Sequence, residues 1–90
     1  MRRVVWSPTA IRDLARIRAF VARFSPVAAA RITSDLQAAG ETLAAHADRG
    51  RPAPGGKREL ATLRPYLIRY RVTTDDVRII RIRHAARRPL

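Results

Sequence analysis

Apolar residues recur at spacings of three and four near the start of the chain, which predicts an amphipathic helix over residues 8–24. Ser7 suits the N-cap of this helix and Pro8 its first position, because serine accepts a hydrogen bond from a free backbone amide and proline has its φ already fixed. The apolar stripe, which we expect to be buried, consists of Ile11, Leu14, Ile17, Val21 and Phe24.

The same punctuation recurs at Ser25-Pro26 and predicts a second helix that runs to about His46. Gly40 lies in its middle and costs about 1 kcal/mol relative to alanine, although it allows close approach to a neighbour. Because the join between the helices is so short, they should form an antiparallel hairpin. The predicted buried stripe of the second helix consists of Ala29, Ile32, Leu36, Ala39 and Leu43.

The rest of the chain predicts short strands. Residues 3–6 are β-branched and aromatic, and residues 57–63, 66–72 and 77–84 carry three further strand patterns. Glycine and proline make residues 47–56 a loop, and residues 85–90 are expected to be irregular. The resulting order, β-α-α-β-β-β, predicts one α+β domain over residues 1–90, in which a helical hairpin packs on one face of a small, mainly antiparallel sheet.

Strand alternation assigns faces to the last two strands, if Val72 lies opposite Val77. We expect the first face to pack on the helices and the second to be open to a partner, although a slip of one residue would exchange them. The first face carries Ile68, Tyr70, Val72, Val77 and Ile79, with Arg81 and Arg83 at its far end, and the second carries Leu67, Arg69, Arg71, Arg78, Ile80, Ile82 and His84. We also expect Trp6, Phe20, Phe24 and Tyr70 in the core.

The charge balance favours an anionic partner. Nineteen basic and seven acidic residues give a formal net charge of +12 over 90 residues. Eighteen of the basic residues are arginine, whose planar guanidinium suits phosphate and carboxylate, but a chain rich in alanine and arginine can equally reflect a GC-rich genome.

Several classes of protein are excluded or disfavoured. The sequence contains no cysteine, so it has neither disulfides nor thiolate metal sites, and a cytoplasmic location fits. No apolar run approaches the roughly 20 residues of a membrane span, and the run after Arg2-Arg3 is too short for a signal peptide. Two distant histidines and scattered carboxylates show no metal-ligand spacing, so we expect neither metal nor cofactor.

Five motifs follow one another along nearly the whole chain: VVWSPTAIRDLARI at 4–17, GRP at 50–52, GKREL at 56–60, PYLIRYRV at 65–72 and IIRIRHAARRP at 79–89. With the order of elements, they resemble the ParE branch of the RelE/ParE toxin superfamily. The resemblance implies the toxin of a type II toxin–antitoxin pair, silenced by a cognate acidic antitoxin. ParE-type toxins act on DNA gyrase, whereas RelE-type toxins share the fold and cleave mRNA on the ribosome.

The residues bear on the choice between these targets. RNA cleavage through a 2′-hydroxyl needs a proton acceptor, cations for the phosphorane and a proton donor for the leaving oxygen. RelE-type enzymes resemble one another in having an arginine directly after the tyrosine that begins the strand, where this chain has Leu67 after Tyr66. After His84 the chain has neither tyrosine nor a second histidine. We therefore expect no catalytic site; if the protein is an RNase, the candidates are Lys57, Arg58, His84 and Arg87.

We expect the partner to contact arginines of the open sheet face, of the strand ends and of the chain end. Glu59 is expected to form an ion pair with a neighbouring cation rather than to act as a base, and His84 is expected to be structural. A basic nucleic-acid-binding domain without toxicity is a third interpretation, and steeply salt-dependent binding would favour it. The residues proposed to contact target or antitoxin are Arg69, Arg71, Arg78, Arg81, Arg83, His84, Arg87 and Arg88.

Overall fold

Both helices begin at the Ser-Pro pairs that predicted them. A computed structural model describes residues 1–86, apart from the side chain of Thr62. In it, β1 (Arg3–Trp6) leads into α1 (Pro8–Ala22), which is followed by α2 (Pro26–Glu41) and a 3-10 turn, η1 (Thr42–Ala44). The Ser7 hydroxyl accepts a hydrogen bond from the Ala10 amide at 3.0 Å, and the Ser25 hydroxyl accepts one from the Ala28 amide at 3.1 Å. The predicted helical hairpin is therefore confirmed, with ends that are a few residues earlier.

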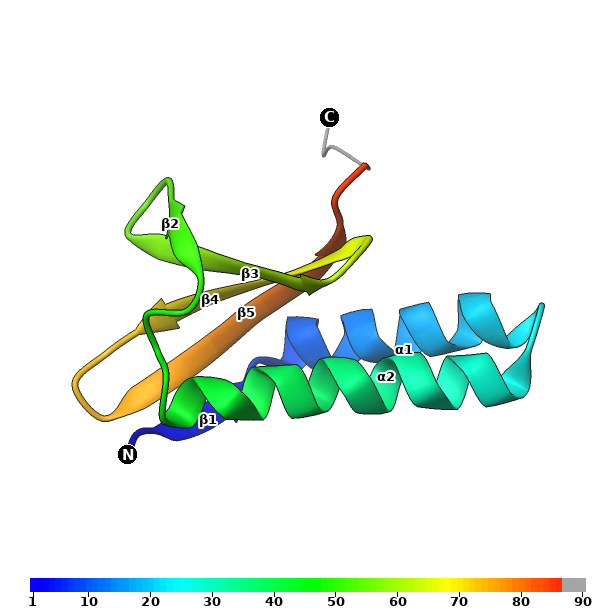
Figure 1. Ribbon diagram of the computed structural model, residues 1–90, viewed down its shortest axis with the longest axis horizontal. Coiled ribbons are helices and arrows are strands. Elements are labelled where there is room, and N and C mark those ends of the chain that lie inside the picture. The colour runs from blue at the N-terminus through cyan, green and yellow to red at the C-terminus, as the bar shows by residue number, and fades with distance from the viewer. Residues whose placement is uncertain (87–90) are drawn as a thin grey trace.

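The second half of the chain forms most of the sheet. It contains β2 (Arg51–Ala53), β3 (Lys57–Leu63), β4 (Tyr66–Val72) and β5 (Asp76–His84). The strand order is β1-β5-β4-β3-β2, with β1 parallel to β5 and the other pairs antiparallel. β2 is a short edge strand inside the predicted loop. Both helices lie on one face of this five-stranded sheet, which confirms the predicted α+β layers (Figure 1).

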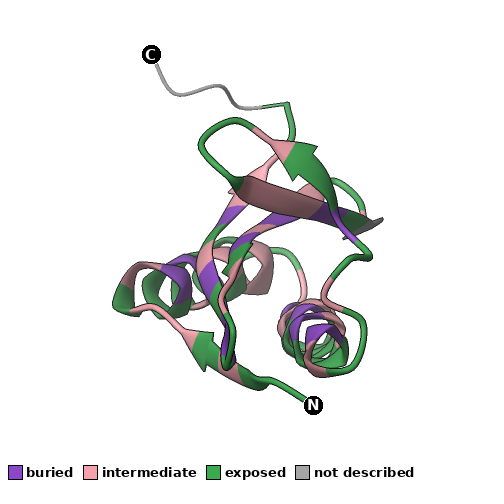
Figure 2. Cartoon of the chain, turned by 90° about the vertical axis from the view of Figure 1, so that its left-hand side faces the viewer, coloured by how far each residue is buried: buried purple, intermediate pink, exposed green. Residues whose placement is uncertain are grey.

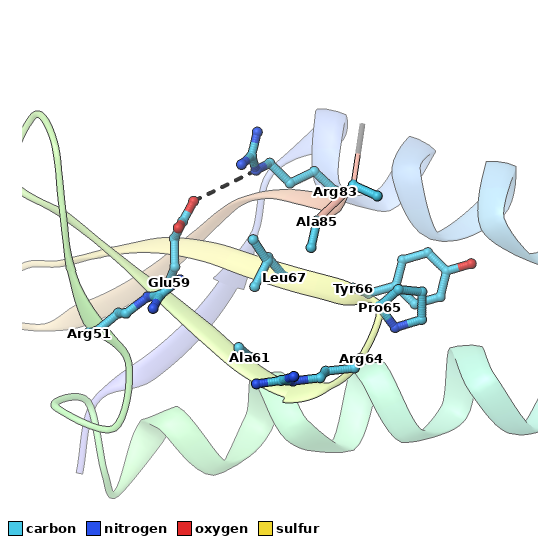
Figure 3. A pocket seen from close by; sticks show the side chains of 10 residues that line it. Arg51, Glu59, Ala61, Arg64, Pro65, Tyr66, Leu67, Arg83 and Ala85 are labelled. Atoms are coloured by element: carbon cyan, nitrogen blue, oxygen red, sulfur yellow. Dashed lines mark ion pairs between the residues drawn. The ribbon is translucent and has the colours of Figure 1, made fainter. Parts of the chain in front are cut away.

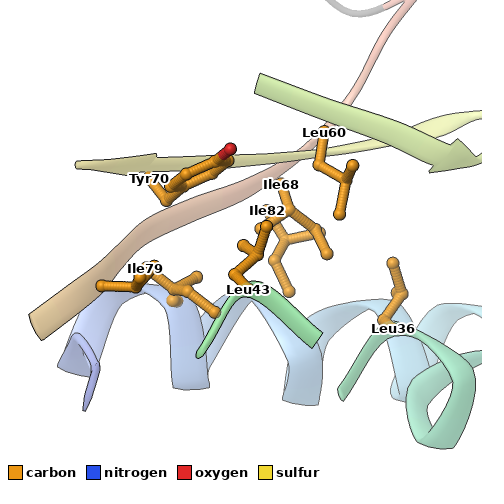
Figure 4. Close-up of a cluster of buried hydrophobic side chains, with 9 residues drawn as sticks. Leu36, Leu43, Leu60, Ile68, Tyr70, Ile79 and Ile82 are labelled. Atoms are coloured by element: carbon orange, nitrogen blue, oxygen red, sulfur yellow. The ribbon is translucent and has the colours of Figure 1, made fainter. Parts of the chain in front are cut away.

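The core fills the space between the sheet and the helices, where the buried residues gather (Figure 2). Figure 4 shows Leu36 and Leu43 of the helical layer below Leu60, Ile68 and Ile82 of the sheet. At Gly40, α2 passes so close to β1 and β5 that no side chain fits: a Cβ atom there would lie 2.6 Å from Trp6 and 2.8 Å from Ile79. Glycine thus lets α2 meet β1 and β5, as the sequence suggested.

A bulge in β5 changes the faces of the last strand. Tyr70 pairs with Ile79 but Arg69 pairs with Arg81, so Ile80 has no partner of its own on β4. The expected alternation holds up to Ile79 and is wrong beyond it. Ile82, predicted on the open face, is therefore buried opposite Ile68. Arg81 and Arg83, predicted at the far end of the face toward the helices, lie opposite Arg69 and Leu67 of the other face.

The buried side of α1 also differs from the prediction at its two ends. Ala10 and Asp13 are its buried residues, so the centre of its buried stripe lies one position before Ile11, which is 55% exposed. Phe20 and Phe24 are exposed rather than part of the core, whereas Tyr70 is fully buried and Trp6 packs against the core.

The helices extend past the sheet. In Figure 1 their connection projects away from the strands, and we call residues 18–31 the hairpin tip. Among the described residues, none from 18–31 belongs to the core cluster or packs against it. No strand packs on the tip, so its side chains contact one another or are exposed to solvent.

Candidate functional site

The sheet face turned away from the helices carries Arg69, Arg71 and Arg78, as strand alternation predicted. On β4, buried Ile68 and Tyr70 alternate with Leu67, Arg69 and Arg71, and successive strand residues point to opposite faces. Arg69 lies opposite Glu59 on β3, while Arg71 lies opposite Arg78 on β5. We call this surface the outer sheet face; it consists of Glu59, Leu67, Arg69, Arg71, Arg78 and Arg83.

Glu59 neutralises the middle of the outer sheet face. Arg69 donates from Nε and Nη2 to Glu59 Oε2, at 3.0 and 2.6 Å. Arg83 Nε lies 3.7 Å from the same oxygen, too far for a hydrogen bond. The Glu59 and Arg69 side chains are only 11% and 28% exposed, so salt and water screen their attraction less than that of a surface pair. The expectation that Glu59 forms an ion pair is confirmed.

Asp13 of α1 binds the part of β5 that extends past its pairing with β1, which ends at Ile79. Its Oδ2 accepts the backbone N–H of Ile82 at 2.9 Å, and the Arg81 guanidinium donates to both carboxylate oxygens at 3.3 and 3.4 Å. Arg81 therefore reaches the edge of the sheet instead of presenting a free cation. At the other end of β5, buried Asp76 forms ion pairs with Arg3 and Arg78, at 3.2 and 3.4 Å.

Of the residues named for a possible RNase site, Arg58 and His84 lie apart along the sheet. Arg58 lies opposite Tyr70 and donates to the Gly50 carbonyl at 2.6 Å. His84 lies opposite Tyr66, four residues along β4, which corresponds to about 13 Å of strand. The His84 and Tyr66 rings meet edge to face, with centroids 5.6 Å apart. Lys57 begins β3 beside Arg58, and Arg87 lies outside the described residues, as does Arg88.

A hollow opens on the outer sheet face at the β3–β4 turn (Figure 3). Its volume is about 690 Å³, and buried Leu67 lies at its centre, with Pro65 and Tyr66 at one end. Arg51 of β2, Arg64 of the turn and Arg83 of β5 surround it, and Glu59 is its only acidic lining residue in the part of the chain that is described.

Sequence reasoning missed this hollow. Arg51 and Arg64 lie in segments assigned to a loop and a break, so nothing in their spacing placed them near Arg83. Asp13 could have been noticed, because an acidic residue one position before the apolar Leu14 falls near the buried stripe of α1 and needs a partner there.

The Tyr70 hydroxyl ties the sheet to the segment after η1. It donates to the Ala47 carbonyl at 2.7 Å and accepts the Gly50 N–H at 2.8 Å. Burial raises the pKa of Tyr70, while the hydrogen bond from Gly50 opposes this effect. The ring is fully buried, so we assign this tyrosine a structural role.

Within residues 1–86, no group of three or more histidine, aspartate or glutamate residues is placed to hold a metal ion. Neither helix in that part of the chain has the length and apolar character needed to cross a bilayer.

Comparison with known proteins identifies relatives along nearly the whole chain. The sequence model of the family described as "ParE toxin of type II toxin-antitoxin system, parDE" matches residues 4–89. Toxin RelE2 of Caulobacter vibrioides is 47% identical over 87 residues, which cover 97% of this chain and 99% of that toxin. Toxin RelE3 of the same organism is 37% identical over 91 residues, with 98% and 99% coverage.

A solved structure supports the same grouping. The chain resembles one in the structure titled "Chromosomal ParDE TA system from P. aeruginosa", with a TM-score of 0.81 and 29% sequence identity. The match covers 93% of this chain and 96% of the other, so the whole fold is shared.

Proposed function

Because this chain belongs to the ParE toxin family of type II toxin–antitoxin systems, we propose that it arrests growth by inhibiting DNA gyrase and that an acidic antitoxin neutralises it. A gyrase inhibitor of this kind would act in the cytoplasm and would need no catalytic residues of its own.

One observation carries the choice of gyrase. Leu67 is only 7% exposed at the centre of the outer sheet face, where the RelE-type RNase pattern has an arginine. A leucine can neither take up a proton nor stabilise the negative charge of a phosphorane. The separation of Arg58 from His84 along the strands supports the same choice, because proton transfer needs groups within hydrogen-bond reach of the substrate.

The hairpin tip is the surface that we propose for the antitoxin. Phe24 and Val27 are 75% and 72% exposed, and the Arg23 guanidinium lies 6.0 Å from the centroids of both the Phe20 and Phe24 rings. Residues 18–31 contain three arginines and no acidic residue. A partner segment with one apolar face and acidic flanks complements this combination, as an amphipathic helix in a groove does.

The proposed function can be tested by inducing the protein without its antitoxin. We expect growth to stop, a DNA-damage reporter to rise and gyrase-linked DNA breaks to accumulate, while bulk mRNA stays intact. Co-expression of a small acidic protein encoded next to the gene should reverse all of these effects. Truncation after Ala86 removes Arg87 and Arg88, which we expect to contact the target, and should abolish these effects; a melting curve checks that the truncated protein is folded.

The alternative is ribosome-dependent mRNA cleavage. The RelE names of the two Caulobacter relatives favour it. Mapping of mRNA 5′ ends after induction separates the two functions. Cleavage at defined codon positions with undamaged DNA would replace gyrase inhibition by the RNase function.

A further inference from the structure

The hollow contains an arginine with an unused hydrogen-bond donor. Arg83 Nε is buried, and among the described residues it has no hydrogen-bond acceptor. The nearest carboxylate oxygen, Glu59 Oε2, already accepts two hydrogen bonds from Arg69. A buried donor without an acceptor is costly, so a ligand that supplies an oxygen here would be favoured.

The balance of charge around the hollow indicates the kind of anion. Glu59 shares its single negative charge between Arg69, at 2.6 Å, and Arg83, at 3.7 Å, so together with Arg51 and Arg64 the lining of the hollow keeps an excess of positive charge. Within residues 1–86, the side chains of Arg51 and Arg64 have no hydrogen-bond or ion-pair partner, and Figure 3 shows both beside the hollow. A carboxylate would offset one of these charges. A phosphate monoester carries a charge of about −1.5 to −2 and offers three acceptor oxygens to guanidinium groups.

The floor of the hollow indicates what is attached to the anion. Leu67, Ala61 and Pro65 give it an apolar surface, and its volume of about 690 Å³ lies in the range of small-molecule sites. We propose that the hollow binds a small phosphate monoester such as a nucleoside 5′-monophosphate. The phosphate lies among Arg51, Arg64 and Arg83, and the organic part lies over Leu67.

Calorimetric titration of the free protein with adenosine 5′-monophosphate, inorganic phosphate and adenosine tests the site without reference to toxicity. We expect the monophosphate to bind more tightly than inorganic phosphate, and adenosine to bind least. Arg83→Gln and Arg64→Gln should each weaken binding of the monophosphate by roughly tenfold or more, because each removes a charge-assisted hydrogen bond. Arg64 is exposed in the turn, so its variant keeps the test valid if Arg83→Gln does not fold.

Arg12→Gln is the matched control, because it removes the same charge from an exposed position on α1, on the other side of the sheet from the hollow and outside the hairpin tip. It should leave the affinity unchanged. Equal weakening by Arg12→Gln and Arg64→Gln would show general attraction to a basic protein and overturn the proposal. So would the absence of monophosphate binding, or equal affinities for the monophosphate and inorganic phosphate.

Discussion

The two halves of the helical hairpin carry the same kind of apolar pattern but have different surroundings. In the covered half, residues 8–17 and 32–44, Leu36 and Leu43 are almost completely buried beneath the sheet. At the hairpin tip, Phe24 and Val27 are exposed for about three quarters of their surface. Periodicity thus identifies the apolar side of a helix, but the reach of the sheet decides which part of that side is covered.

The difference also separates stability from binding. Apolar surface that is buried within the chain contributes to the free energy of unfolding, whereas exposed apolar surface contributes only when a partner covers it. If the hairpin tip serves a partner, substitutions in the two halves should affect different measurements.

The largest effect is expected for Leu36→Ala in the covered half. Leu36 is 1% exposed in the core cluster, so truncation leaves a cavity and should lower the free energy of unfolding by about 2–5 kcal/mol. Urea denaturation measures this loss. A cost below 1 kcal/mol would mean that the covered half is packed as loosely as the tip, and the comparison would fail.

A smaller loss is expected at Asp13, which links the covered half to the edge of β5. Asp13→Ala removes the acceptor of the buried Ile82 N–H and the partner of Arg81, and should cost about 1–3 kcal/mol. Asp13→Asn keeps an oxygen for the Ile82 N–H and should recover most of this loss, because the Arg81 side chain is 48% exposed and its ion pair is screened. Equal losses in the two variants would assign the stability to the ion pair instead.

Local patterns predicted the elements better than they predicted the faces. Ser7-Pro8 and Ser25-Pro26 define helix starts through contacts within four residues, and these starts were correct. The bulge at Ile80 was not predictable, because it depends on how β5 meets both β4 and α1. The bulge places Ile82 in the core and sends Arg81 to Asp13.

The candidate site was predicted only in outline. Arg69, Arg71 and Arg78 lie on the expected face, but the hydrogen bonds of Arg69 to Glu59 and of Arg71 to the Gly55 carbonyl join residues that are 10 and 16 positions apart in the sequence. Arg51 and Arg64 line the same hollow as Leu67 because β2 pairs with β3, and the loop sequence did not predict this strand pairing.

Tyr70 provides a test of the core through pH. An unfolded tyrosine ionises near pH 10, whereas burial raises the pKa of Tyr70 in the folded protein. Above pH 10 the unfolded state therefore loses this proton first, so stability should be complete below that pH and fall as pH rises through the folded pKa. Melting curves between pH 8 and about 11 measure the decline.

Tyr70→Phe should remove this component of the decline. It should also cost about 1–3 kcal/mol at neutral pH, because the buried Gly50 N–H loses its acceptor. Tyr66→Phe is the control for tyrosine ionisation elsewhere, since that ring is only half-buried. If both variants show the same pH profile as the parent, the Tyr70 hydroxyl does not contribute to the alkaline loss of stability.

The smallest effect on stability, and the sharpest test of the comparison, is expected for Phe24→Ala at the hairpin tip. The side chain is 75% exposed, so its loss should change the free energy of unfolding by less than about 0.5 kcal/mol. The same substitution should weaken binding of the acidic antitoxin by at least about fivefold, because a large aromatic side chain covered by a partner typically contributes more than 1 kcal/mol. Gln37→Ala, at an exposed position on the covered half of α2, should alter neither quantity. Urea denaturation and calorimetric titration with the antitoxin measure the two effects on the same samples. If Phe24→Ala destabilises the free protein as much as Leu36→Ala, the tip belongs to the core; if antitoxin binding is unchanged, the exposed phenylalanine does not serve that partner.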